Sequence, residues 1–91
     1  MAVIIAVPAP YRKATGGKAE LEIEASCVGQ VIDGLVQDYP DLAKRLVTAE
    51  GSLNPHVSVY VNGSRVSRGE AMERALNDGD RLVIMPVISG G

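Results

Sequence analysis

The most regular alternation of apolar and polar residues lies at positions 18–25. The expected inward set is Ala19, Leu21, Ile23 and Ala25, and the outward set is Lys18, Glu20, Glu22 and Glu24. A period of two predicts a β-strand, and the charged face is typical of a sheet edge. Residues 3–7 are apolar at both parities, which predicts a central strand. The Gly16-Gly17 turn within the loop at 11–17 predicts a hairpin between these two strands.

A helical period follows the second strand. The apolar residues recur with the spacing of one helical face and are expected to point into the core: Val28, Val31, Ile32, Leu35 and Val36. We expect Ser26 to be the N-cap and Tyr39-Pro40 to end the helix. A short second helix capped by Asp41 follows, and residues 50–55 form a loop.

The C-terminal half predicts three more strands. Residues 57–61 alternate, Asn62-Gly63 is a strong hairpin signal, and residues 65–66 form a short return strand. Residues 70–76 are expected to form one helical turn. The turn residues at 77–80 precede a buried strand at 81–85, and regular pairing should stop at Pro86, which has no backbone N–H to donate.

This order of elements predicts an α+β fold with two layers. It resembles the β-grasp, ubiquitin-like fold: a mixed sheet of four to five strands packed on one main helix, with the first and last strands parallel at the centre. We expect a β-grasp domain over residues 1–86 and a flexible tail over residues 87–91, which comprises Val87, Ile88, Ser89, Gly90 and Gly91.

Composition narrows the classes of partner. The 91 residues suit one domain, and 46% are hydrophobic although Phe and Trp are absent. The net charge of −2 argues against nucleic acid and anionic membranes, which both favour a basic face. One cysteine excludes an internal disulfide. With no signal-peptide pattern and no transmembrane stretch, we expect a cytoplasmic protein.

The candidate reactive group is the carboxylate of Gly91. Glycine lacks a Cβ, so Gly90-Gly91 would fit a narrow channel in a partner enzyme. A terminus with no role is the alternative. Cys27 is expected near the start of the first helix, where a thiolate is favoured, yet a small buried hydrophobe is the simpler interpretation. His56 has no cysteine or carboxylate at the spacing of metal ligands, so we expect no metal site. No serine or cysteine lies in a nucleophile motif, so we expect no catalytic residues.

Three motifs together resemble the MoaD/ThiS family of sulfur carriers. They are Val59-Tyr60-Val61-Asn62-Gly63, the stretch at 75–86 with Asp78-Gly79-Asp80 and Pro86, and Gly90-Gly91. The front half resembles the cysteine-forming, CysO-like branch in four segments: residues 3–8, Thr15-Gly16-Gly17, Tyr39-Pro40 and residues 44–46. The molybdopterin branch stays open, and the thiamine branch fits less well because its shortest members lack the second-helix insertion.

The resemblance implies a mechanism and a set of partners. An E1-like enzyme would adenylate Gly91 with ATP, and a sulfur donor would convert it to a thiocarboxylate. The acceptor would be a cysteine synthase-like enzyme or the large subunit of molybdopterin synthase, and a C-terminal metalloprotease is a further partner. The chain itself would bind no cofactor and would be a co-substrate, not an enzyme. The rival functions are a ubiquitin-like modifier joined through Gly91 to lysines, and a binding module with an idle tail.

The strand parity also predicts a partner-binding surface. If the opposite parity faces the helix, then Ile4, Tyr60, Val83 and Met85 share the other face of the sheet. An exposed apolar patch beside a reactive tail is typical of an interface, and scattered surface residues are the alternative. Arg12 and Lys13 are expected near the tail, where they would guide it or meet an acidic partner.

Overall fold

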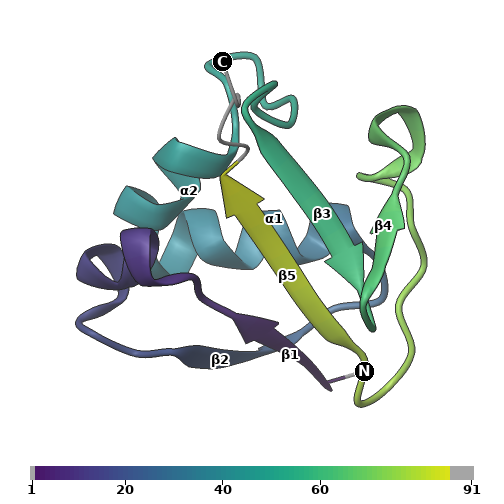
Figure 1. Cartoon of the computed structure of the whole chain (residues 1–91), viewed down its shortest axis with the longest axis horizontal. Coiled ribbons are helices and arrows are strands. Elements are labelled where there is room, and N and C mark those ends of the chain that lie inside the picture. Colours follow the sequence, from purple (N-terminus) through teal and green to yellow (C-terminus); the bar gives the residue numbers. More distant parts are fainter. Residues whose placement is uncertain (1, 87–91) are drawn as a thin grey trace.

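Five strands form one mixed sheet in the order β2-β1-β5-β3-β4 (Figure 1). The structure, a computed structural model, describes residues 2–86. The strands are β1 (Ala2–Ala6), β2 (Glu20–Glu24), β3 (Val57–Val61), β4 (Ser64–Val66) and β5 (Arg81–Pro86). β1 and β5 run parallel, and the other neighbouring pairs are antiparallel. The expected central pair, the β2 edge and both hairpins are confirmed.

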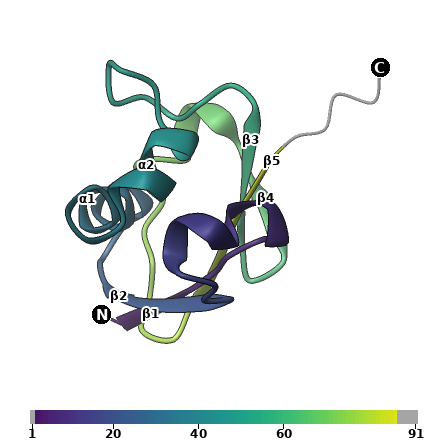
Figure 2. The same cartoon turned by 90° about the vertical axis from the view of Figure 1, so that its left-hand side faces the viewer.

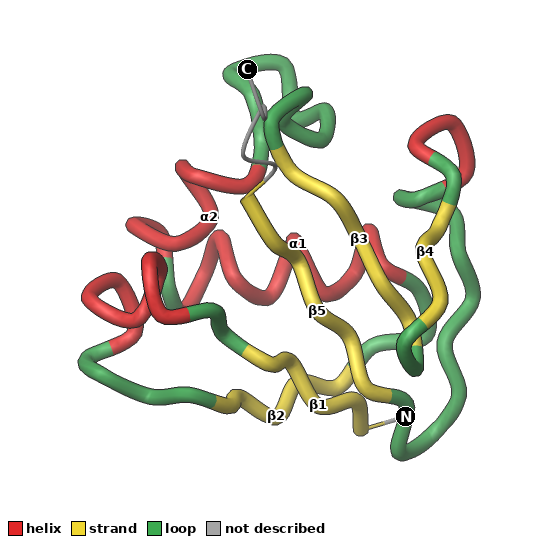
Figure 3. The backbone as a smooth tube through the Cα atoms, viewed as in Figure 1, coloured by secondary structure: helices red, strands yellow, loops and turns green. Residues whose placement is uncertain are grey.

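The helical segments lie on one face of this sheet, as Figures 2 and 3 show. They are the α-helices α1 (Val28–Asp38) and α2 (Pro40–Leu46) and the 3-10 segments η1 (Ala9–Thr15) and η2 (Arg68–Glu70). The core lies between sheet and helices. The largest fully buried side chains are Leu35, Leu42, Leu46, Leu82, Val3, Val7, Val28, Val31, Val57 and Val59. The prediction of an α+β domain built on one main helix is confirmed.

The first turn of α1 differs from the prediction at its cap. Cys27, not Ser26, is the N-cap residue, and its side chain makes no capping hydrogen bond. The backbone N–H groups of Val28 and Gly29 donate instead to the carbonyls of Arg74 (3.0 Å) and Met72 (2.8 Å). A side-chain cap is not needed because a distant segment already satisfies these donors. Ser26 instead donates through its backbone N–H and its hydroxyl to Gln30 Oε1, at 2.7 and 2.9 Å.

Other predicted details were wrong at the ends of elements. Val36 is 51% exposed, because α1 packs on the sheet through its other apolar residues and leaves this side chain beside Pro40 and Val47. Ala19 is exposed, since β2 begins only at Glu20. α2 begins at Pro40, whose missing N–H costs nothing in a first turn, so Asp41 lies within that turn and is not its cap.

One predicted loop contains short helical structure, and one predicted helical turn begins earlier than expected. The 11–17 loop holds η1, which buries Tyr11 and ends at Gly16 in the left-handed conformation with φ 69°. The expected helical turn at 70–76 begins earlier, as η2, and continues as hydrogen-bonded turns. In both places local backbone hydrogen bonds organise the segment before the next strand begins.

The turn before β5 is fixed by an Asn62–Asp80 network. Asn62 Nδ2 donates to Asp80 Oδ1 at 3.0 Å, and the backbone N–H of Asn77 donates to Asp80 Oδ2 at 2.8 Å. Arg81 N donates back to Asn62 Oδ1 at 2.9 Å. The network joins the β3–β4 turn to the start of β5. These hydrogen bonds, that from Asn77 foremost, lower the pKa of Asp80.

The lowered pKa of Asp80 predicts an acid-sensitive contribution to stability. Since the folded-state pKa lies below the ordinary 3.8, this contribution is complete above that value. It is lost as the pH falls through the lowered pKa. Asp80→Asn cannot ionise and should flatten the fall in unfolding free energy below about pH 4, measured by urea titration between about pH 6 and about pH 2. Parallel losses in the two proteins would contradict this assignment.

Candidate functional site

The sheet face away from the helices carries the predicted partner-binding residues. On this face Ala6 lies beside Val83, Val83 beside Tyr60, and Tyr60 beside Arg65. Ile4 lies beside Arg81 in the next row. We call this surface the open face, because none of the helical segments among the described residues covers it (Figure 2).

The opposite parity is buried, as predicted. Val3, Ile5, Val59, Val61, Leu82 and Ile84 are each at most 2% exposed. On the open face Ile4, Tyr60 and Val83 are half-buried, whereas Met85 is 43% exposed. The alternation along β3 and β5 therefore separates a core surface from an apolar surface that stays accessible.

A hollow of about 430 Å³ crosses the open face between η1 and β5. Its apolar lining includes Ala6, Pro8, Val83 and Met85, and its charged lining is Arg12, Glu20 and Arg81. Arg12 Nε donates to the carbonyl of Val7 at 3.1 Å, which fixes the guanidinium at the margin. This combination suits an apolar partner side chain next to a charged one.

One ion pair spans the hollow. Arg81 Nη2 and Glu20 Oε2 are 2.6 Å apart, from β5 to β2 across the intervening strand β1. Both side chains are about half exposed, at 49% and 54%. Solvent screens such a pair, so it contributes little to stability and can be rearranged by a partner. We did not predict this pair from the sequence, although Arg81 shares the parity of Val83 and Met85.

The structure therefore brings together Arg12, Val83 and Met85 around the hollow. Ile4 and Tyr60 extend the same face to either side. Lys13 lies in a different hollow against α2. β5 ends at Pro86, opposite Val57. The predicted tail residues Val87, Ile88, Ser89, Gly90 and Gly91 lie outside the described residues.

The remaining candidates carry no catalytic arrangement. Cys27 is half-buried, not the fully buried residue that the simpler interpretation predicted. His56 is exposed. Within residues 2–86 no three His, Cys, Asp or Glu side chains form a group that could hold a metal ion. None of the helices in this part of the chain is long and apolar enough to span a membrane.

Comparison with protein families gives one match across nearly the whole chain. The model of the ThiS family matches residues 5–91, which includes the Gly90-Gly91 pair and the Asn62 and Asp80 positions of the turn network. The match covers β5 and the segment after it, so the similarity extends through the candidate reactive residue.

Individual relatives include both carriers and modifiers. Sulfur carrier protein CysO of Mycobacterium tuberculosis is 31% identical over 93 residues, covering 100% of both chains. Small archaeal modifier protein 3 of Haloferax volcanii is 36% identical over 86 residues, covering 91% of each chain. Among solved structures, one chain of the Amycolatopsis orientalis BexX/CysO complex superimposes with a TM-score of 0.86 at 32% identity, covering 98% of this chain and 99% of that one. These neighbours confirm the β-grasp fold.

The strand register of the site predicts opposite outcomes for two adjacent residues. Ile84→Lys would bury an unpaired charge and should destabilise the domain by about 4 kcal/mol or more. Met85→Lys places its charge on the exposed side and should change stability by about 0.5 kcal/mol or less. Thermal melts of both variants check the contrast. The reverse order would mean that the register is wrong by one residue.

Proposed function

The chain belongs to the ThiS family, and from that premise we propose that it is a sulfur carrier protein whose C-terminal Gly91 carboxylate becomes a thiocarboxylate. The observation that carries the proposal is the full-length similarity to a named sulfur carrier protein, in a match that covers all of both chains. Sulfur carriers are co-substrates of other enzymes.

The proposed chemistry has two steps and needs no catalytic side chain from this chain. The Gly91 carboxylate attacks the α-phosphorus of ATP on an E1-like enzyme, forming an acyl adenylate and releasing pyrophosphate. Sulfide then attacks the acyl carbon, AMP leaves with the electron pair of the broken C–O bond, and the thiocarboxylate remains. A persulfide donor gives an acyl disulfide at this step, and a second thiol must reduce its S–S bond to release the thiocarboxylate. Activation is required because a free carboxylate is a poor acyl donor. ATP is the cofactor of the partner and is not bound by the carrier.

The fold supports this chemistry by ending β5 beside a candidate docking surface. β5 pairs with β1 over residues 81–83 and with β3 over residues 82–86, so Pro86, after which the tail begins, is still paired with Val57. Met85, the residue before Pro86, is exposed on the open face and lines the hollow. We propose that the activating enzyme docks on this face through Ile4, Tyr60, Val83, Met85 and Arg12, and receives residues 87–91 in its active-site channel.

The sulfur acceptor is proposed from the relatives. A structural relative comes from a complex that contains CysO and a second protein, BexX, so carriers of this kind assemble with protein partners. The similarity to CysO favours a cysteine synthase-like acceptor. The large subunit of molybdopterin synthase is the next candidate, and the thiamine branch is the least favoured. A metalloprotease that trims or recycles the C-terminus completes the proposed set of partners, and a cytoplasmic location suits all of them.

A ubiquitin-like modifier is the second candidate function. The similarity to small archaeal modifier protein 3, at 36% identity, favours it. Adenylation of Gly91 is common to both functions, and the acceptor separates them. Isopeptide adducts between Gly91 and target lysines would identify a modifier, whereas free thiocarboxylate would identify a carrier.

The first test is the mass of the product. After incubation with the E1-like enzyme of the same organism, ATP and sulfide, intact-mass analysis should show one oxygen replaced by sulfur, and fragmentation should place the sulfur at Gly91. Gly90→Val should react much more slowly, since a β-branched residue stiffens and widens the tail. An unchanged mass with an enzyme that demonstrably activates a carrier would exclude the proposal.

The second test concerns the open face. Tyr60→Ala removes a large contact, and Met85→Lys adds a charge that docking must desolvate. Each should weaken binding to the activating enzyme by about 1–3 kcal/mol, or about 5- to 150-fold in Kd. Binding titrations measure this, and thermal melts confirm that both variants are folded. Wild-type affinity in both variants would show that the enzyme binds elsewhere.

A further inference from the structure

A second, positively charged hollow lies between η1 and α2. It has a volume of about 350 Å³ and is lined by Lys13, Ala14, Asp41, Lys44 and Arg45. Three of these five residues are cationic, although the whole chain has a net charge of −2. The segments that supply them lie about thirty residues apart in the sequence and are brought together by the packing of α2 on η1. The fold therefore concentrates positive charge in one place on an acidic protein.

Among residues 2–86, none of the three cations of this hollow forms an ion pair. Within residues 2–86 the ion pair that forms is Glu20–Arg81, so Lys13, Lys44 and Arg45 make none there, not even with Asp41 beside them. Burial raises the pKa of the adjacent Tyr11 hydroxyl, and the Arg45 guanidinium partly offsets that rise. The three cations thus leave an unneutralised positive potential, which favours an external anionic group.

The hollow lies at the end of the molecule where β5 stops. Ile84 of β5 shares a small cavity with Leu42 and Leu46 of α2. The loop after α2 is held against that helix, because the backbone N–H of Asn54 donates to the carbonyl of Leu46 at 2.8 Å. The loop then leads into Val57 of β3, which is paired with Pro86 of β5. The elements that line the hollow, η1 and α2, therefore also pack against the C-terminal half of β5.

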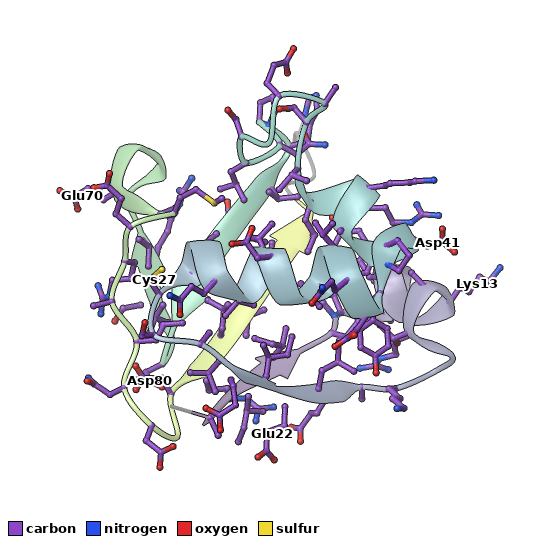
Figure 4. All side chains as sticks on the ribbon, turned by 180° about the vertical axis from the view of Figure 1, so that it is seen from behind. Lys13, Glu22, Cys27, Asp41, Glu70 and Asp80 are labelled. Carbon is purple, nitrogen blue, oxygen red and sulfur yellow. The ribbon has the colours of Figure 1, made fainter. Side chains whose placement is uncertain are left out.

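The end of the molecule opposite the basic hollow carries charges of both signs. Figure 4 shows Lys13 and Asp41 together at one end, while Glu70 and Asp80 lie at the opposite end. The opposite end also carries the exposed acidic residues Glu73 and Asp78. Exposed Arg74 lies among these acidic residues and offsets part of their charge. In the hollow three cations face one acid, so an acidic surface is attracted more strongly there.

We propose that Lys13, Lys44 and Arg45 form a docking surface for an acidic surface of the adenylating enzyme, separate from the open face. The inference rests on the proposed function, because that function supplies the partner. The adenylating enzyme is chosen over the sulfur acceptor because every version of the function, carrier or modifier, needs the activation step. The open face would hold the complex once formed, and the basic hollow would accelerate and orient its formation.

Charge reversal with a matched control tests this surface. Lys44→Glu reverses one charge in the hollow, and Arg74→Glu makes the same change in net charge near Cys27 and Asp80, at the other end. Association with the purified adenylating enzyme would be followed by stopped-flow fluorescence at low ionic strength and at about 0.5 M salt. Lys44→Glu should slow association about 3- to 10-fold at low ionic strength, and the difference should vanish in high salt. Arg74→Glu should associate at least as fast as wild type.

The outcomes separate this proposal from the proposed function. Equal slowing of association by Lys44→Glu and Arg74→Glu would show that only the net charge matters, and would overturn the docking surface. A wild-type association rate for Lys44→Glu would overturn it as well. If wild type itself forms no acyl adenylate, the proposed function fails first. If wild type is activated while Lys44→Glu behaves like it, only the docking surface is wrong.

Discussion

The parallel pairing of β1 with β5 is the contact on which the rest of the structure depends. It joins the first strand to the last across about eighty residues. The chain must therefore leave β1, form the other strands and the helices, and return beside β1 as β5. The intervening helices pack on one face, which leaves the other face open. The same pairing places Ala6 beside Val83 and the end of β5 beside α2 and η1. Both candidate docking surfaces follow from this one register.

The sequence predicted the elements with a strong period and failed where distant contacts decide. Alternation in β2 and β5 separates buried from more exposed residues so clearly that a one-residue error would reverse the pattern. The ends of helices are not marked by such a periodic pattern. The start of α1 depends on carbonyls of Arg74 and Met72, which no local pattern around Ser26 reveals. Val36 satisfies the helical period, yet its side chain is 51% exposed beside Pro40 and Val47.

The candidate site was predictable in part for the same reason. Parity alone placed Tyr60 and Met85 on a shared face, and three motifs taken together, at 59–63, 75–86 and 90–91, indicated the family. The hollow on the open face and the Glu20–Arg81 pair were not predictable from the sequence. Both depend on the side chains of Glu20 and Arg81 meeting diagonally across β1, where the small side chain of Ala6 lies in the same row as Glu20. The basic hollow likewise needs η1 and α2 to pack together, and sequence spacing carries no information on that contact.

The distant capping of α1 has a consequence for how the molecule opens. The amides of Val28 and Gly29 are held by the segment around Met72 and Arg74, and Cys27 forms a backbone bridge with Ala75. These residues must therefore exchange with solvent as one cooperative unit, although more than forty positions separate them in the chain. The half-buried thiol of Cys27 lies within this unit. Its rate of alkylation would report, as a built-in probe, how often the segment detaches while the central sheet stays closed.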